Sequence, residues 1–431
     1  MRIDRIEWDG AHVRELAAQL RSLGPQLSEV AAQVERIVTD VREGGDAALR
    51  EIAERLGEGA PHSSRVDPDA VAAAPGLLEP NVREALRTAA RNIEAVARAE
   101  LDARLRPAAV ELPEAQRVEV REEPVASAGI YAPGGRGDYP SSVLMCCIPA
   151  RVAGVARICV ASPPGPSGRP GAAVLAACAL VGVEEVYALG GAQAIAALAL
   201  GTETVGRVDV IAGPGGRYVT EAKRRLSATV GIDGIAGPSE LMVVADGTAN
   251  PEWLALDVCA QAEHGEDTLL IVGSPDVALL DRLEELVIDL APERPSVART
   301  RLALVACAGL EGALTLSDHI APEHLELSFQ GADETVARAR VAGCVFIGGG
   351  GATAFGDYAA GSNHVLPTGG AARFGGPLGP GTFHRRTSIV SISRSAATVL
   401  APHVVALSGA EGFPVHGESA AVRGLPGEGS F

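Results

Sequence analysis

Two adjacent residues in the second half of the chain could carry acid–base chemistry. The segment Ala321-Pro322-Glu323-His324-Leu325 places a carboxylic acid beside an imidazole. An imidazole exchanges a proton near neutral pH, and a neighbouring carboxylate can orient it or serve a different proton. The alternative is an ordinary dipeptide behind a proline that begins a helix. The adjacency therefore predicts a catalytic pair only if the fold buries both side chains in one site.

A predicted helix over residues 251–264 carries two candidate metal ligands. Asn250 is a favourable N-cap and Pro251 a favourable first helical residue. Gln261 and His264 are three residues apart, so both side chains emerge on one face of the last turn. The alternative is a polar helix end, where the helix dipole favours His264.

A glycine-rich stretch over residues 348–381 contains a third cluster. Glycine alone would indicate a flexible linker, but Asp357, Tyr358, Asn363 and His364 alternate there with apolar residues. Long structured loops in compact proteins are usually functional. Carboxylate, imidazole and amide groups together suit zinc or a similar divalent ion better than a closed thiolate site does.

Glycine-rich turns follow three of the predicted strands, at residues 134–135, 190–193 and 213–216. Backbone N–H groups at a helix N-terminus bind phosphate, and glycine permits close approach. The sequence contains neither GxGxxG nor GxxxxGK[ST], so a standard dinucleotide fingerprint and a P-loop are both unsupported, and plain α/β turns are the alternative. Lys223 is the only lysine. This reflects either compositional bias or an amine that arginine cannot replace.

The elements that must position these residues fall into two regions. Helical spacing over residues 27–56, broken at Gly44-Gly45, and over residues 80–105 predicts a mostly helical first hundred residues. Strands and helices then alternate, which is typical of parallel sheets with crossover helices and implies two α/β domains. The predicted strands span residues 128–131, 157–161, 185–189, 208–212, 240–245, 269–272, 302–306 and 344–347.

Composition excludes several classes of protein. The chain has 431 residues, which is more than one hydrophobic core usually serves. Its composition, 47% hydrophobic and 21% charged, fits neither a disordered nor a fibrous protein. A net charge of −17 disfavours nucleic acid and anionic membranes as partners. The first residues lack a signal-peptide pattern, and no stretch is long and apolar enough to cross a bilayer, so we expect a cytoplasmic protein. The seven cysteines form no CxxC pair, which favours buried free thiols.

Eight strings in collinear order resemble the histidinol dehydrogenase family over about residues 28–420. They are GIYAPGG (129–135), YPSSVLM (139–145), GGAQAIAALALGT (190–202), YVTEAKR (218–224), AGPSE (236–240), QAEHG (261–265), APEHLEL (321–327) and GDYAAGSNHVLPT (356–368).

The resemblance implies a zinc enzyme that oxidises L-histidinol through the aldehyde to L-histidine with two NAD, the last step of histidine biosynthesis. It implies Glu323 and His324 as catalytic bases. The zinc ligands it implies are Gln261, His264, Asp357 and, from a partner subunit, His416. These four and His324 would also contact substrate, together with Ser239, Tyr358, His364 and Glu411. Its implied cofactor contacts are Tyr131, Gln193 and the position of Gly216.

The resemblance also implies a fold of two interlocked, incomplete Rossmann-like domains in a homodimer with shared active sites. Residues 1–24 would be an N-terminal arm, residues 25–128 with 237–378 the zinc and catalytic domain, residues 129–236 the inserted NAD domain, and residues 379–431 a dimerisation tail. The chain departs from the family pattern at Gly216, where an Asn that contacts the cofactor is expected, and at Cys146, which replaces an Asn.

Two other functions stay open from the sequence. A paralogue could keep the zinc and the bases yet oxidise another small polar alcohol, because a few contacts decide specificity. Retention of Ser239, His364 and Glu411 disfavours that alternative. The chain could also be a non-catalytic metal-binding dimer, which the intact Glu323 and His324 disfavour.

Overall fold

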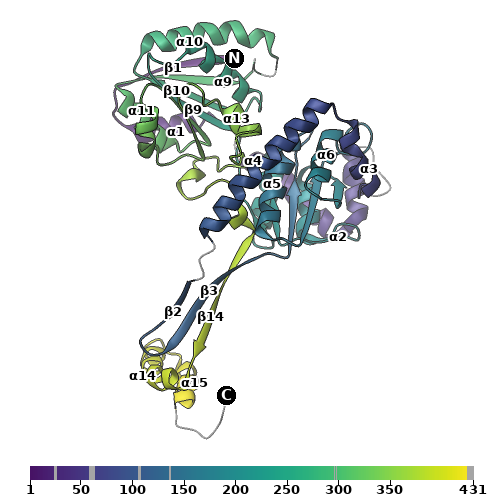
Figure 1. Ribbon diagram of the computed structural model, residues 1–431, viewed down its shortest axis with the longest axis vertical. Helices are drawn as coiled ribbons and strands as arrows, with labels where there is room; N and C mark the ends of the chain where they lie inside the picture. Colours follow the sequence, from purple (N-terminus) through teal and green to yellow (C-terminus); the bar gives the residue numbers. More distant parts are fainter. Residues whose placement is uncertain are drawn as a thin grey trace. The chain divides into compact units, whose positions relative to one another are not determined.

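The computed structural model describes residues 1–23, 27–57, 64–104, 108–134, 137–295, 297 and 299–424. The chain forms two compact units (Figure 1). Unit 1 comprises Met1–Glu100 and Val125–Phe383, and unit 2 comprises Leu101–Pro124 and His384–Phe431. The expected α/β class is confirmed, because unit 1 is built on two parallel sheets.

The first sheet of unit 1 has six parallel strands in the order β1-β11-β10-β9-β12-β13. These are β1 (Arg2–Trp8), β9 (Glu240–Ala245), β10 (Leu269–Ser274), β11 (Arg301–Cys307), β12 (His324–Ser328) and β13 (Cys344–Ile347). Helices α9 (Pro251–Ala262) and α10 (Val277–Leu290) cover one face, and α1 (Val13–Arg21) and α11 (Leu310–Ile320) cover the other (Figure 1). The strand order reverses direction between β9 and β12.

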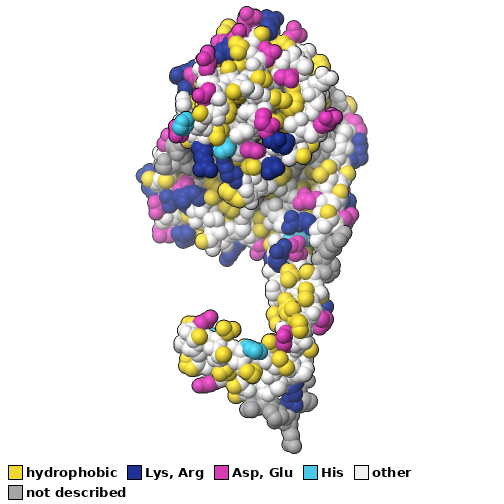
Figure 2. Space-filling view, turned by 90° about the vertical axis from the view of Figure 1, so that its left-hand side faces the viewer, with side chains coloured by type: hydrophobic (Ala, Val, Ile, Leu, Met, Phe, Trp, Pro, Cys, Tyr) yellow, Lys and Arg dark blue, Asp and Glu magenta, His cyan; other side chains and the backbone are white. Residues whose placement is uncertain are grey.

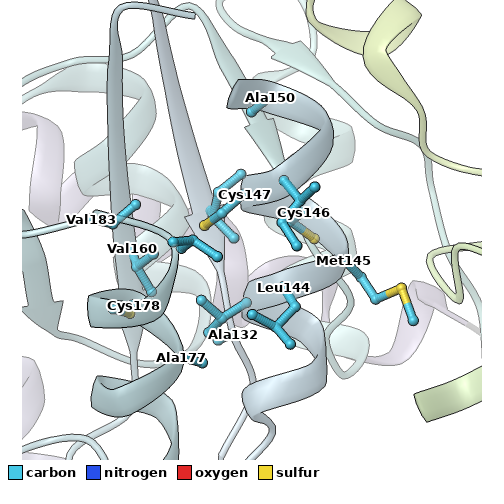
Figure 3. Packing of buried hydrophobic residues seen from close by; sticks show 14 of the residues in the cluster. Ala132, Leu144, Met145, Cys146, Cys147, Ala150, Val160, Ala177, Cys178 and Val183 are labelled. Atoms are coloured by element: carbon cyan, nitrogen blue, oxygen red, sulfur yellow. The ribbon is translucent and has the colours of Figure 1, made fainter. Parts of the chain in front are cut away.

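The second sheet has five parallel strands in the order β6-β5-β4-β7-β8. These are β4 (Ser127–Tyr131), β5 (Arg157–Ser162), β6 (Val186–Ala188), β7 (Val210–Ala212) and β8 (Gly231–Ile232). One face packs on α5 (Pro140–Ala153) and α6 (Ala172–Leu180), whose small and sulfur-containing side chains interdigitate (Figure 3). The other face packs on α2 (Ala31–Leu56), α7 (Gly191–Leu200) and α8 (Arg217–Leu226).

Unit 2 combines a three-stranded antiparallel sheet with two helices. The sheet has the order β14-β3-β2, from β2 (Ala108–Glu111), β3 (Gln116–Pro124) and β14 (His384–Ile392). The helices α14 (Arg394–Ala410) and α15 (Pro414–Gly424) pack on each other. The remaining α-helices of the described chain are α3 (Pro68–Ala73), α12 (Ala332–Thr335) and α13 (Thr353–Tyr358) in unit 1, and α4 (Pro80–Arg104), which runs from unit 1 into unit 2.

The predicted strands are confirmed, each within two residues at either end; those predicted at 185–189 and 208–212 are shorter in the structure. The predicted break at Gly44-Gly45 is a kink inside α2, where Gly45 leaves helical geometry with φ 52° and ψ −132°. Asn250 caps α9 as expected, accepting from the backbone N–H of Glu252 and Trp253.

The packing differs from the expected domain boundaries at two places. Residues 1–24 do not form a separate arm, because β1 pairs with β11 along its whole length and extends the six-stranded sheet. Residues 25–100 pack mainly on the five-stranded sheet, although Leu378 shares a cluster with α4, and Asn92 of α4 donates to the Ala359 carbonyl at 2.8 Å. The apolar faces of α2 and α4 join the clusters on the five-stranded sheet. Amphipathic periodicity predicts a helix but not the sheet it covers.

All seven cysteines are free thiols, and six of them are buried, as expected; Cys344 is half-buried. No helix within the described ranges is long and apolar enough to cross a bilayer. Gly135, the last residue of the string GIYAPGG, lies outside the described residues.

Candidate active site

The two predicted catalytic bases, Glu323 and His324, lie at the amino-terminal edge of the six-stranded sheet. His324 is the first residue of β12, and Glu323 directly precedes it, so the alternative of a helix beginning at Pro322 is wrong. Ala321, with φ 50°, ends α11 in the left-handed region and turns the chain into the strand. Because β12 is parallel to β9 and His324 pairs with Leu241, the amino ends of both strands meet at the pair.

A carboxylate network holds Glu323. Its Oε2 accepts from the backbone N–H of Glu240 at 2.8 Å, and its own N–H donates to Oε2 of Glu240 at 3.3 Å. Burial raises the pKa of Glu323 well above its ordinary value; the bond from the Glu240 N–H opposes this, and the charges of Glu240 and Asp357 add to it. A buried carboxyl with a raised pKa is a strong base once it is ionised.

Glu240 is itself anchored at the start of β9. Its Oε1 accepts from Nη1 of Arg21 at 2.9 Å and from the N–H of Gly369 at 2.9 Å. The Arg21 guanidinium also donates to the backbone carbonyls of Ile320 and Ala321, at the end of α11. Glu240 and Arg21 thus form a hydrogen-bond network that fixes the position of Glu323. The sequence did not single out either residue. The only signal was that Glu240 ends the string AGPSE.

His324 is buried between two carboxylates. Its Nδ1 lies 3.9 Å from Oε2 of Glu323, and its Nε2 lies 3.8 Å from Oδ1 of Asp357. Burial lowers the pKa of His324 to about 4, outweighing the opposing effect of the Asp357 charge. The imidazole is therefore neutral at pH 7 and able to accept a proton.

Helix α9 brings Gln261 to the same edge, because it runs back from the carboxyl end of β9 to the amino end of β10. The Gln261 side chain is buried, and among the residues that the structure describes neither its amide oxygen nor its nitrogen has a hydrogen-bond partner. Buried polar groups rarely lack partners, so a missing one calls for an explanation such as a bound ion. His264 follows in the turn after α9, with Nδ1 3.2 Å from the Gln261 carbonyl.

The glycine-rich loop is structured, as expected, and carries Asp357 and His364. Asp357 lies in α13, and His364 is held by its Nδ1 at 2.9 Å from the Asp357 carbonyl and its Nε2 at 3.5 Å from Oγ of Ser142. Burial lowers the pKa of His364. Asn363 donates to the Met145 carbonyl at 2.6 Å, which fixes the loop on α5. Tyr358, at the end of α13, is exposed.

The structure brings together five of the predicted catalytic, zinc and substrate residues at this edge: Glu323, His324 and Asp357 by direct distances, and His264 and His364 by their electrostatic effect on His324. Ser239 directly precedes β9, and its carbonyl accepts from the N–H of Leu269 at 3.0 Å. Within the described ranges, no group of three His, Cys, Asp or Glu side chains lies close enough to hold a metal ion. The Gln261 amide would add a ligand of another type.

The predicted cofactor residues lie at the carboxyl edge of the five-stranded sheet. Tyr131 ends β4, and its hydroxyl accepts from the N–H of Gly191 at 3.0 Å, where α7 begins. Gln193 is buried in the first turn of α7, and Gly216 caps α8 after β7. Here the strand order reverses between β4 and β7, which is where open parallel sheets bind ligands.

Unit 2 carries the remaining predicted residues, Glu411 and His416. Glu411 is the C-cap of α14. His416 is exposed in the first turn of α15, with its ring 5.5 Å from that of Phe413. Within unit 2, both side chains are available to solvent.

One parallel sheet carries the buried Glu323 and His324, and the other has glycine-rich turns where its strand order reverses. Together these features define an α/β oxidoreductase. The histidinol dehydrogenase family model matches residues 22–424. The histidinol dehydrogenase of Rhodospirillum rubrum is 42% identical over 421 residues, covering 94% of this chain and 95% of that protein. The Leifsonia xyli enzyme is 44% identical over 404 residues, covering 90% and 91%.

A crystal structure of histidinol dehydrogenase from Elizabethkingia anophelis has a TM-score of 0.87 at 30% identity and covers 98% of each chain. The chain belongs to the histidinol dehydrogenase family, whose members are NAD-dependent dehydrogenases that catalyse the final two oxidations of histidine biosynthesis.

Proposed function

We propose that this chain oxidises L-histidinol to L-histidine in two steps, with zinc and two NAD, as a cytoplasmic homodimer. The observation that carries the proposal is the buried pair Glu323 and His324, which offers two proton acceptors of different character on one edge of one sheet. Two successive oxidations at one carbon need two such acceptors. Buried free thiols fit a reducing compartment.

His324 serves the first oxidation. The hydroxyl proton of the alcohol passes to the neutral imidazole while the carbon gives a hydride to the nicotinamide, and the aldehyde results. Because burial keeps the pKa of His324 at about 4, the imidazole is unprotonated at the start of each turnover. Asp357, 3.8 Å away, stabilises the imidazolium that forms.

Glu323 serves the second oxidation. As the ionised base it takes a proton from water as that water adds to the aldehyde. The hydrate then gives a second hydride to a second NAD and a further proton to a base, which leaves the carboxylate. The N–H of Glu240 holds one oxygen of Glu323, so the other is directed to the water.

The donor set fits zinc. The Gln261 amide is buried and has no hydrogen-bond partner within the described part of the chain, and Asp357 and His264 add a carboxylate and an imidazole from the same edge. Nitrogen and oxygen ligands of this kind are typical of an open zinc site. We assign these three and His416 as ligands; the bound ion would hold the imidazole and amine of histidinol. Ser239, Tyr358, His364 and Glu411 would contact the remaining substrate groups.

Exposed apolar side chains of unit 2 support the proposed dimer. Apolar side chains on α14 and α15 are exposed, among them Leu407 (66%), Phe413 (55%) and Val415 (69%), and hydrophobic surface is visible over this unit in Figure 2. Exposed apolar patches of this kind mark interaction surfaces. We propose a second copy of the chain as the occupant, because His416 on the same helix would complete the zinc site of that copy. L407E/V415E should sediment as a monomer; an unchanged dimer would contradict the assignment.

The test is NAD reduction by the zinc-loaded protein with L-histidinol and with a panel of other small amino alcohols, before and after chelation. The proposal expects turnover of histidinol alone and its loss on chelation. Preference for another alcohol would support the paralogue, and no turnover with zinc and NAD bound would support a non-catalytic role.

A further inference from the structure

The only lysine of the chain is buried beneath one of the glycine-rich turns. Lys223 lies in the second turn of α8, with 4% of its side chain exposed. Its Nζ donates to the Gly213 carbonyl at 2.5 Å and to Oδ1 of Asp233 at 2.6 Å. Asp233, directly after β8, is 6% exposed.

Lys223 and Asp233 form hydrogen bonds with both backbone polar groups of Gly213. Oδ2 of Asp233 accepts from the N–H of Gly213 at 2.8 Å, while Lys223 holds the carbonyl of the same glycine. Gly213 begins the turn at residues 213–216 and has φ +123°, a conformation that residues with a side chain rarely adopt. A Cβ at this position would collide with the backbone carbonyl of Tyr131, so the turn is pressed against the end of β4.

Arginine cannot replace this lysine. A compact ammonium can bring separate N–H donors to a carbonyl and a carboxylate at short range, whereas a guanidinium is planar and larger. Every other side chain of the Lys/Arg class in the sequence is arginine. The exception lies where a single buried nitrogen has to bridge two acceptors.

We propose that Lys223 is a positioning residue for the cofactor. Through Gly213 it fixes the turn whose last residue, Gly216, begins α8 at the switch point of the five-stranded sheet. The inference rests on the proposed binding of NAD there. Because Lys223 is buried beneath the turn, in this proposal it acts by keeping the turn in the one conformation that the cofactor meets, and not as a catalytic residue.

The variant that tests this is K223M/D233N. Removing Lys223 alone would leave a buried carboxylate without its partner and would destabilise the fold. In the double variant the amide oxygen at position 233 can still accept from Gly213 N–H, so the hydrogen bond to the Gly213 carbonyl is lost together with the ion pair, and no buried charge is left unpaired. We expect KM and Kd for NAD to rise about tenfold or more, the effect of one lost charge-assisted hydrogen bond. We expect kcat at saturating NAD, KM for histidinol and zinc content to stay within about threefold.

R225M is the matched control on the same helix. Arg225 pairs with Glu221 at 2.8 Å and does not contact the turn. Its loss should leave KM for NAD unchanged. An equal rise in both variants, or an unchanged NAD affinity in a folded K223M/D233N, would overturn the proposal.

A second measurement uses the single lysine of the wild-type protein. Acetylation by an N-hydroxysuccinimide ester, read by mass spectrometry against the α-amino group, should be slower at Lys223 when NAD is bound. An unchanged rate, with calorimetry showing bound NAD, would contradict the proposal. Because calorimetry measures NAD without turnover, a wild type that binds NAD but leaves histidinol intact would refute the activity while the variants still test Lys223. A wild type that binds no NAD would refute both.

Discussion

Replacing Glu240 by glutamine should lower the free energy of unfolding and lower the pKa of Glu323. The carboxylate accepts from Arg21, from Gly369 N–H and from Glu323 N–H. Glutamine keeps one oxygen and presents an NH₂ group to at least one of these donors. A hydrogen bond to a charged group is worth about 1.5–3 kcal/mol, so with the pair to Arg21 neutralised we expect a loss of about 2–4 kcal/mol.

Arg21 limits the loss, because its side chain is 21% exposed and also donates to the Ile320 and Ala321 carbonyls. With a urea dependence of about 2–3 kcal/mol per molar, the midpoint should fall by about 1 M. The fluorescence of Trp8, buried in the same sheet, reports the transition. The control R301M removes a partly exposed pair with Asp4 on that sheet and should cost at most about 1 kcal/mol.

The same variant has a pH signature. The charge of Glu240 helps to raise the pKa of Glu323, so E240Q should lower that pKa. Glu323 acts as a base when ionised, so the rate of the second oxidation rises as pH passes upward through its pKa. In E240Q this rising limb should move to lower pH, measured with histidinaldehyde as substrate. An unmoved limb together with an unmoved urea midpoint would refute the role assigned to Glu240.

Three further substitutions test individual assignments. H324N should lower kcat for the first oxidation by about 10²–10⁴, because the alcohol proton loses its acceptor, with a small change in KM for histidinol; full activity would exclude His324 as that base. H416N should lower zinc content and activity without unfolding the protein, and unchanged activity would sink the shared site. G216N should lower KM for NAD, since Gly216 has φ −69° and open space around a Cβ, so the side chain expected in this family fits without strain; an unchanged KM would mean that position does not contact the cofactor.

The sequence predicted most of the local structure and the central pair. Asn250 and Pro251 predicted the start of α9, because a helix start depends on neighbouring residues. Glu323 and His324 are adjacent in the sequence, so this pair could be recognised without the fold. The support behind the pair could not be read this way. Arg21 and Glu240 are far apart in the chain, and they meet because α1 packs on one face of the six-stranded sheet that contains β9.

Sheet membership was also beyond the sequence. The strand β1 pairs with β11, some three hundred residues later, and the apolar face of α2 would suit either sheet. Such choices depend on packing between distant segments, whereas periodicity reports only which face of an element is buried. The role of Lys223 was visible as an oddity of composition, and Asp233 and Gly213 gave it a structural reason.

The central claim is that one site performs both oxidations. The most direct test is the number of NADH formed per L-histidinol when histidinol is limiting and NAD and zinc are in excess, with the product identified by mass spectrometry. The proposed function predicts two NADH and L-histidine for the wild type, and one NADH with accumulated aldehyde for E323Q. One NADH per histidinol in the wild type, or two in E323Q at the wild-type rate, would contradict it.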